Sequence, residues 1–501
     1  MKRSDIALTL AGVLAATMVS ACSPSAEDTV LLPVKNDPSI SFRIWFKVGS
    51  QNDPVGKEGL AQLTASMLTD ASTTNNSYEE ILDKLYPLAA NYDAATSVEM
   101  TVASGRTHRD NVLEFYPLFM DALLRPAFRE EDLERIRSQM LNYLENSLRY
   151  ASDEDLGKAV LYNDIFAGTP YGHLTAGTVK GIRSITIDDI RSFYQQHFTR
   201  ENFVIGLAGS YDDNLLEMIR GDLASLPEGH GLQIDKPKPA PIDGMQVTIV
   251  EKDAPATAIS MGFPIDIVRG SREWYALAVA NSWLGEHRNS SSHLYQVIRE
   301  ERGLNYGDYS YIENFPEGSR RQMPPQNVAR RQQIFEIWIR PVPHEVRHFA
   351  IRAALREFRM LVENGMSKED FELTRNFLSK YVLHYAPTTM ERLGYALDDR
   401  FYGVQGSHLE LFRKMMGEVT LEDVNSAIRK YWQYGNMQIA IITKDAEGMK
   451  EMLVSDVESP ITYSSPKAAS VLEEDKEIIR FPLDIKAENV KIVEVGGLFE
   501  E

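Results

Sequence analysis

Two histidines one helical turn apart are the most obvious potential metal ligands in the chain. His344 and His348 enclose Glu345 in the pattern H-E-x-x-H. On a helix, this spacing lets both imidazoles face one zinc ion while the carboxylate activates a bound water. No third ligand follows, and Arg347 and Arg352 would oppose a divalent cation. A zinc peptidase acting through this pattern is therefore the least favoured of the functions that we consider.

The second half of the chain repeats a pattern of the first half, and this repeat determines in which domain each other candidate residue lies. Residues 185–190 match residues 419–424, and each segment begins a helix whose first turn is acidic and whose cap is Thr186 or Thr420. An apolar strand follows each helix. The repetition predicts two copies of one domain, joined by a proline-rich linker without helical or strand period at residues 232–244.

The expected fold class is α+β, with two duplicated sandwich domains in which helices pack on a mostly antiparallel sheet. The expected division is a signal peptide at 1–22, an N-terminal domain at 23–231, the linker at 232–244, a C-terminal domain at 245–463 and a tail at 464–501. Strands are expected at 41–48, 95–103, 246–250, 258–263, 306–313 and 334–340. Helices are expected at 58–71, 78–88, 110–124, 132–147, 275–284, 292–301 and 345–363. The tail contains a strand-like run at 490–495 that the sequence does not place.

The segment 59–67, which follows a loop-like run at 48–58, resembles the start of the pitrilysin/insulinase family of zinc metallopeptidases. In that family the same loop leads into a helix bearing H-x-x-E-H. The three matching positions here are Gln62, Ala65 and Ser66, and the family's further glutamate ligand falls near Tyr143. None of these side chains suits zinc catalysis. The resemblance therefore implies a peptidase scaffold whose two domains face each other across a cleft and which binds no zinc of its own.

Arg299 and Tyr306 resemble the family's second signature, an arginine and a tyrosine seven positions apart between a helix and a strand. In the family, this pair reaches across the cleft toward the substrate carbonyl. A guanidinium and a phenol are preorganised donors for charge that develops in the transition state. The alternative interpretation is a surface ion pair for Arg299 and a packed strand residue for Tyr306.

The segment 89–97 resembles the small-residue edge strand on which family members lay extended peptides. Ala94 and Thr96 are the substrate-binding candidates there, because small side chains allow a peptide backbone to approach and pair with the strand. An ordinary edge strand remains an equal alternative.

The first residues resemble a bacterial lipoprotein signal, with Lys2 and Arg3, a short apolar run and a lipobox that ends at Cys22. We expect Cys22 to carry lipid and to anchor the chain in the periplasm, on the outer membrane of a Gram-negative bacterium. Cys22 is the single cysteine, so no disulfide can form within the chain. The net charge of −19 disfavours nucleic acid as a partner.

Taken together, these patterns predict a non-catalytic subunit of a two-subunit metallopeptidase. It would be inactive alone, bind no cofactor itself, and complete a sister subunit that carries H-x-x-E-H and zinc and acts on unfolded or short peptides. The alternative is a catalytically dead structural or assembly protein on the same scaffold. Four arginines in the loop 320–331 could contact an acidic partner or anionic lipid, or the loop could simply be solvated.

Overall fold

The computed structural model describes residues 29–501, so the expected signal segment and Cys22 lie outside the described residues. The first sheet contains β1 Thr29–Pro33, β2 Ser39–Phe46, β3 Asn91–Thr96, β4 Thr101–His108 and β5 Phe203–Gly209. Its strand order is β1-β5-β2-β4-β3. The pair β1–β5 is parallel and the other pairs are antiparallel.

The second sheet repeats this topology. Its strands are β6 Met245–Glu251, β7 Thr257–Ile265, β8 Asp308–Tyr311, β9 Gln333–Val342, β10 Met437–Thr443 and β11 Val490–Glu494. The order β6-β10-β7-β9-β8 matches the first sheet strand for strand and direction for direction, and β11 is added beside β6. The predicted α+β class, with two mostly antiparallel sheets and packed helices, is confirmed.

Helices surround both sheets. In the first half they are α1 Leu60–Thr69, α2 Tyr78–Leu85, α3 Val112–Leu124, α4 Glu130–Asn142, α5 Asp153–Ile165, α6 Val179–Ser184, α7 Ile187–His197 and α8 Asp213–Leu223. In the second half they are α9 Arg272–Gly285, α10 Arg347–Asn364, α11 Lys368–Tyr381, α12 Thr389–Tyr402, α13 His408–Glu418, α14 Leu421–Tyr431, α15 Ala446–Ser455 and α16 Ala469–Ile478. The caps expected at Thr186 and Thr420 are present, and each side chain accepts a hydrogen bond from a backbone N–H in the first turn of its helix. Within residues 29–501, no helix combines the length and apolar composition needed to cross a membrane.

One sequence prediction about local structure is wrong, and two predicted helices are present but contain π-helical turns. The strand expected at 95–103 is a hairpin between β3 and β4, because Ser97 and Met100 close a turn through backbone and side-chain hydrogen bonds. The α-helices expected at 132–147 and 292–301 contain π-helical turns, at Tyr143–Ala151 and Tyr295–Glu300. Strand-like alternation of apolar residues does not reveal a tight turn between two strands, and the helical period does not distinguish an α-helix from a π-helix, which has about one extra residue per turn.

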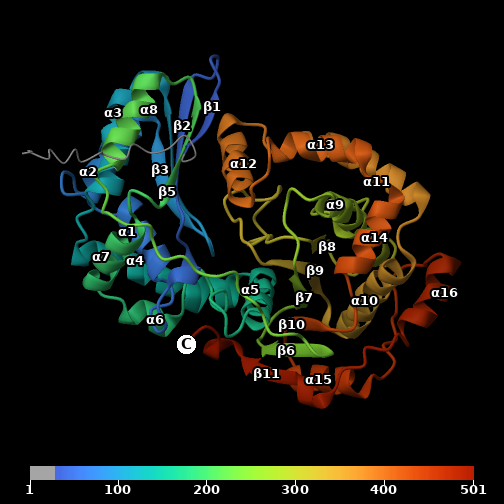
Figure 1. The fold of residues 1–501 in the computed structure, drawn as a ribbon. Coiled ribbons are helices and arrows are strands. Elements are labelled where there is room, and N and C mark those ends of the chain that lie inside the picture. Colours follow the sequence, from blue (N-terminus) through green and yellow to red (C-terminus); the bar gives the residue numbers. More distant parts are fainter. Residues whose placement is uncertain (1–28) are drawn as a thin grey trace, which may run out of the picture.

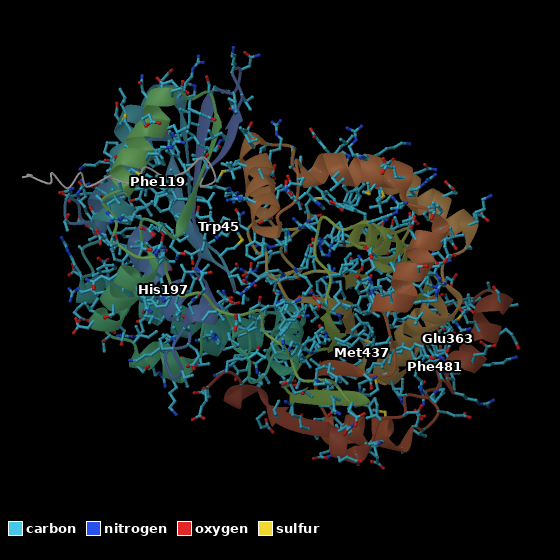
Figure 2. All side chains as sticks on the ribbon, in the orientation of Figure 1. Trp45, Phe119, His197, Glu363, Met437 and Phe481 are labelled. Carbon is cyan, nitrogen blue, oxygen red and sulfur yellow. The ribbon has the colours of Figure 1, made fainter. Side chains whose placement is uncertain are left out.

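Each sheet buries both of its faces. Along β2, Phe42 and Ile44 enter the apolar core under the helices of the first half, with Phe119 of α3. Trp45 points to the opposite face and packs with Met100 and with Leu397 of α12. Figure 2 shows Phe119 and Trp45 on these two sides of the first sheet.

The second face of each sheet is covered by a helix from the other half. Helix α12 packs on β1, β2 and β5, and α5 packs on β7 and β10 (Figure 1). Gly157 lets α5 lie close to its sheet, because an added Cβ would stand 3.3 Å from Oγ of Ser260. A buried ion pair, Lys158 on α5 with Glu336 on β9, joins the halves at 2.8 Å. We call α5 and α12 the exchanged helices.

The C-terminal segment 456–501 contacts both halves. Arg352 of α10 donates to the carbonyls of Val457 and Ile479, and β11 then extends the second sheet. At the end of the chain, Phe499 enters the core of the first half, and its carbonyl accepts from the N–H of Val179. The face of α10 that carries His348 and Arg352 is consequently buried, not exposed as its polar residues suggest.

Candidate functional site

Helix α1 is fixed at its N-terminus by a buried carboxylate. The two oxygens of Asp53 accept hydrogen bonds from the N–H groups of Gly59 and Ala61, both at 2.7 Å. Gly59 has φ 102°, and an added Cβ there would lie 2.4 Å from Cδ1 of Ile182. The loop-to-helix junction expected from the sequence is therefore a rigid one.

The three positions of the family's zinc motif lie in the first two turns of α1. Nε2 of Gln62 donates to Oγ of Ser66 at 3.3 Å, so these side chains, one turn apart, contact each other. Ala65 between them is fully buried. An amide, a methyl group and a hydroxyl do not form a zinc site. Within residues 29–501, no group of three His, Cys, Asp or Glu side chains is placed to hold a metal ion.

Tyr143 begins the π-helix Tyr143–Ala151, at the position of the family's further ligand. Burial raises the pKa of its phenol to about 12, with contributions from Glu317 and Asp155, so the side chain is neutral at physiological pH. A neutral phenol is a poor zinc ligand.

Arg299 and Tyr306 line one open cavity of about 570 Å³ in the second half. Arg299 stands on the π-helix Tyr295–Glu300, and its Nη1 lies 3.3 Å from the exposed carboxylate of Glu300. Its Nε makes no hydrogen bond with any described residue. The side chain of Tyr306 is 75% exposed. The two residues thus border one cavity, and the ion pair with Glu300 matches the alternative interpretation of Arg299.

The turn that carries Tyr306 is built to hold it. Nδ2 of Asn305 donates to Oδ1 of Asp308 at 2.8 Å and to the carbonyl of Arg340 at 3.1 Å, while its Oδ1 accepts from the N–H of Gly307. Gly307 has φ 149°, and an added Cβ would lie 2.3 Å from the hydroxyl of Tyr309. Tyr306 is therefore presented to solvent from a fixed backbone.

The structure does not bring the two signatures into one cavity. The residues that line the Arg299/Tyr306 cavity all belong to the second half, and none comes from α1. This cavity therefore does not extend to Gln62, Ala65 and Ser66. The reason is visible in the fold: the exchanged helices and the residues between β8 and β9 fill the space between the two sheets.

The edge-strand prediction for Ala94 and Thr96 is correct in position. Strand β3 is the last strand of the first sheet and pairs with β4 alone. Ala94 is half-buried against the core, and Oγ1 of Thr96 lies 3.2 Å from Oγ1 of Thr101. Among residues 29–501, no strand pairs with the N–H and C=O groups on the outer side of β3, and strand addition by a peptide requires such unpaired groups.

The two histidines of the H-E-x-x-H pattern have separate structural roles. Nδ1 of His344 lies 2.8 Å from the hydroxyl of Thr257, and its Nε2 lies 3.1 Å from the carbonyl of Ala254. His348 is buried under the C-terminal segment, and burial, helped by Arg352, lowers its pKa to about 4. The chain turns from a 3₁₀-helix into α10 between the two histidines, so they do not share one regular helix.

The segment 312–332, between β8 and β9, packs against the first half, and we call it the inter-strand loop. Arg331 donates to both oxygens of Glu99 at 2.7 Å, and the guanidinium of Arg330 lies 5.0 Å from the ring centroid of Phe166. Oγ of Ser319 donates to Asp155 at 2.5 Å. Arg330 and Arg331 thus contact residues of the first half of the same chain. They are neither simply solvated nor free to contact a partner, which were the two interpretations of the sequence.

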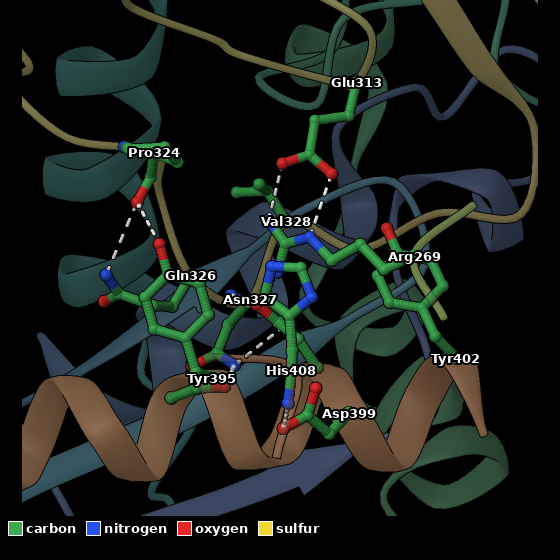
Figure 3. A network of polar contacts seen from close by, with 12 residues as sticks. Arg269, Glu313, Pro324, Gln326, Asn327, Val328, Tyr395, Asp399, Tyr402 and His408 are labelled. Atoms are coloured by element: carbon green, nitrogen blue, oxygen red, sulfur yellow. Dashed lines mark hydrogen bonds and ion pairs between the residues drawn. The ribbon is translucent and has the colours of Figure 1, made fainter. Parts of the chain in front are cut away.

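A buried polar network that the sequence did not reveal fixes the inter-strand loop on α12. Arg269 binds Glu313 through two hydrogen bonds, as Figure 3 shows. The N–H of Asn327 donates to Asp398, and its Nδ2 donates to the carbonyl of Gly394. Burial raises the pKa of Asp398 to about 7. These residues are far apart in sequence and share no motif, so only the fold identifies them.

Comparison with known proteins decides the family. Residues 29–179 match the model of the insulinase family, peptidase family M16, and residues 184–378 match the model of the peptidase M16 inactive domain. The chain belongs to the insulinase (M16) family. The family predicted from segment 59–67 and the Arg299/Tyr306 pair is confirmed.

The relatives of this insulinase-family chain carry peptidase and non-peptidase names. An uncharacterized zinc protease of Streptomyces coelicolor is 27% identical over 55% of this chain and 60% of its own length. Another, from Rickettsia bellii, is 26% identical over 54% of this chain and 64% of its own length, so the chain spans less than two thirds of these two relatives. The non-peptidase homolog YmxG of Helicobacter pylori is 22% identical over 88% of this chain and 99% of that protein.

Solved structures support the same fold. A peptidase M16 inactive domain from Pseudomonas fluorescens superposes with a TM-score of 0.73 at 23% identity, covering 84% of this chain and 97% of the other. A Helicobacter pylori protease superposes with a TM-score of 0.67 at 17% identity, covering 83% and 96%. At these identities the likeness concerns the fold alone.

Proposed function

We propose that this chain is the zinc-less subunit of a two-subunit insulinase-type peptidase. It supplies Arg299 and Tyr306 to a sister subunit whose H-x-x-E-H helix holds the zinc ion. One observation carries the proposal: the positions for zinc hold Gln62, Ala65 and Ser66, while Arg299 and the exposed Tyr306 border one open cavity.

The chemistry of this subunit is hydrogen-bond donation to a peptide held by two chains. The guanidinium of Arg299 and the hydroxyl of Tyr306 donate to the substrate carbonyl, and these bonds strengthen as negative charge develops on its oxygen. The fixed turn around Tyr306 means that little reorganisation is needed at that step. The cavity contains no residue of the first half. Arg299 and Tyr306 therefore act on a peptide that is held by another polypeptide, the sister subunit.

Three further parts of the proposal concern placement and substrate. Cys22 carries the lipid that anchors the assembly at the periplasmic face of the outer membrane. The free edge of β3, at Ala94 and Thr96, pairs with extended segments of unfolded or short peptides. Zinc belongs to the sister subunit, because residues 29–501 of this chain offer no ligand set that fits it.

The test is reconstitution with an insulinase-family subunit that carries H-x-x-E-H. The mixture is expected to cleave peptides, and each subunit alone is expected to be inactive. Arg299→Ala is expected to lower kcat/KM of the mixture by about 10²–10³-fold, the usual cost of one oxyanion donor. The matched control is Arg413→Ala, an exposed arginine outside the cavity. Light scattering verifies that each variant still assembles.

A structural or assembly role is the second candidate. The close packing of the inter-strand loop between the halves favours it, as does the name of the Helicobacter pylori relative, a non-peptidase homolog. In that case Arg299→Ala and Tyr306→Phe would leave every activity of the complex unchanged. Normal turnover of an assembled Arg299→Ala mixture would therefore exclude the peptidase-subunit proposal and leave the assembly role.

A further inference from the structure

The cavity that contains Arg299 and Tyr306 has rigid, apolar walls. Pro255, Pro341, Pro343 and Leu304 form much of the lining. His344 also borders the cavity, but both of its ring nitrogens are engaged by Thr257 and Ala254. A ligand there would meet fixed hydrophobic surface on its sides, and its polar interactions would come from a small number of other groups.

Those other groups are mainly cationic or hydrogen-bond donors. Lys444 lines the same cavity as Arg299 and Tyr306. The backbone of Lys444 is anchored, because its carbonyl accepts from Nη1 of the buried Arg347 at 2.7 Å. Within residues 29–501, no carboxylate pairs with its ammonium group. Glu345 is the acidic residue among those that line the cavity, and Glu300 pairs with Arg299 from outside the lining, which leaves the ammonium group of Lys444 as the cation that a ligand would meet.

We infer that this cavity binds a carboxylate group of the peptide substrate, between Arg299 and Lys444. The inference rests on the proposed function, because it takes the cavity as the place where a peptide meets Arg299 and Tyr306. A guanidinium presents a planar fork that matches a carboxylate, and an ammonium adds a second charge-assisted hydrogen bond. The proline walls suit the methylene groups that precede a carboxylate. The assembly would accordingly prefer peptides with an acidic side chain or a free C-terminus beside the bond that is cleaved.

The preference can be measured on the full chain without the sister subunit, by fluorescence polarisation with labelled ten-residue peptides. The first peptide is neutral except for one glutamate and a free C-terminus. Three companions replace the glutamate by glutamine, amidate the C-terminus, or do both. Binding is expected to weaken at least about tenfold when the recognised carboxylate is lost, and to weaken with rising salt.

Lys444→Gln is expected to reduce that discrimination between acidic and neutral peptides by about tenfold. Lys35→Gln is the matched control, since Lys35 is exposed and outside the cavity. Loss of binding on the glutamine change assigns the group to a side chain, and loss on amidation assigns it to the chain terminus. Both results support the inference. Equal binding of all four peptides, or discrimination that survives Lys444→Gln unchanged, overturns it.

The outcome is separable from that of the proposed function. Turnover of the mixed subunits and its loss in Arg299→Ala test the subunit role with a neutral peptide. If turnover depends on Arg299 but the four peptides bind equally, only the carboxylate inference fails. If the peptides with a carboxylate bind selectively but no H-x-x-E-H subunit is activated, the carboxylate inference stands and the proposed subunit function is wrong.

Discussion

The ion pair between Lys158 and Glu336 offers the sharpest test of how the two halves are held together. Nζ of Lys158 lies 2.8 Å from both carboxylate oxygens of Glu336, and the hydroxyl of Tyr162 donates to the same carboxylate at 2.9 Å. The side chains of Lys158 and Glu336 are 3% and 0% exposed. Lys158 comes from an exchanged helix and Glu336 from the opposite sheet, so their contact spans both halves.

Lys158→Met removes the positive charge and leaves Glu336 buried with a single hydroxyl partner. Leaving one partner of a buried pair uncompensated costs about 3–5 kcal/mol of unfolding free energy. Adding Glu336→Gln removes the stranded charge and keeps an acceptor for Tyr162. The double variant is therefore expected to recover at least half of the loss, although it has lost the ion pair completely.

Urea unfolding followed by far-UV circular dichroism measures the three proteins. Lys476→Met is the control, because Lys476 pairs with Glu473 on an exposed helix face, where an ion pair contributes little. If Lys158→Met shifts the midpoint no more than Lys476→Met does, the pair is not buried as described. If the double variant is as unstable as the single one, the stranded charge is not the cause.

Three further predictions concern the turn, the buried histidines and the zinc positions. Asn305→Ala leaves buried Asp308 without its hydrogen-bond donor, so it is expected to cost about 1–3 kcal/mol of unfolding free energy. It is also expected to lower turnover of the mixed subunits, as loss of the Tyr306 hydroxyl in Tyr306→Phe would under the peptidase-subunit proposal. Burial lowers the pKa of His197 to about 4 from 6.5. Between these two pH values the unfolded state binds a proton that the folded state does not, so the stability of the folded state is expected to fall as the pH drops from 6.5 to about 4. His197→Phe removes this group and is expected to make the urea midpoint less dependent on pH. Restoring the family's ligands takes Gln62→His, Ala65→Glu, Ser66→His and Tyr143→Glu. This fourfold variant is expected to bind stoichiometric zinc by elemental analysis while the natural chain binds none, and failure of the folded variant to bind would show that α1 and the π-helix do not form the site geometry.

Local and repeated features were predictable from the sequence. The capped helices at Thr186 and Thr420, the strand alternation and the helix at α1 depend on neighbouring residues, and the structure has them where they were expected. The equal topology of the two sheets follows from the repeat. The pairing of Arg299 with Tyr306 in one cavity was also foreseeable, because both lie on one short helix–turn–strand segment.

Features that depend on distant partners were not predictable. The α10 face that carries His348 and Arg352 is polar, yet the C-terminal segment covers it and Arg352 is fully buried. A solvated inter-strand loop was one interpretation of the sequence, yet Arg331 pairs with Glu99 and Arg330 lies over the ring of Phe166, both in the first half. Lys444 enters the Arg299 cavity from a loop far along the chain. Periodicity describes one element at a time, so it cannot tell which remote segment will cover a face.

The exchanged helices carry a consequence for the origin of the chain. Neither half can shield its own sheet on both sides, since α5 and α12 each serve the neighbour. A half-length ancestor would have exposed a broad apolar surface as a monomer, and it could have buried that surface by trading the same helix with an identical molecule. Gene duplication and fusion would then have turned a symmetric pair into one polypeptide, freeing each copy to lose or keep a different part of the original chemistry.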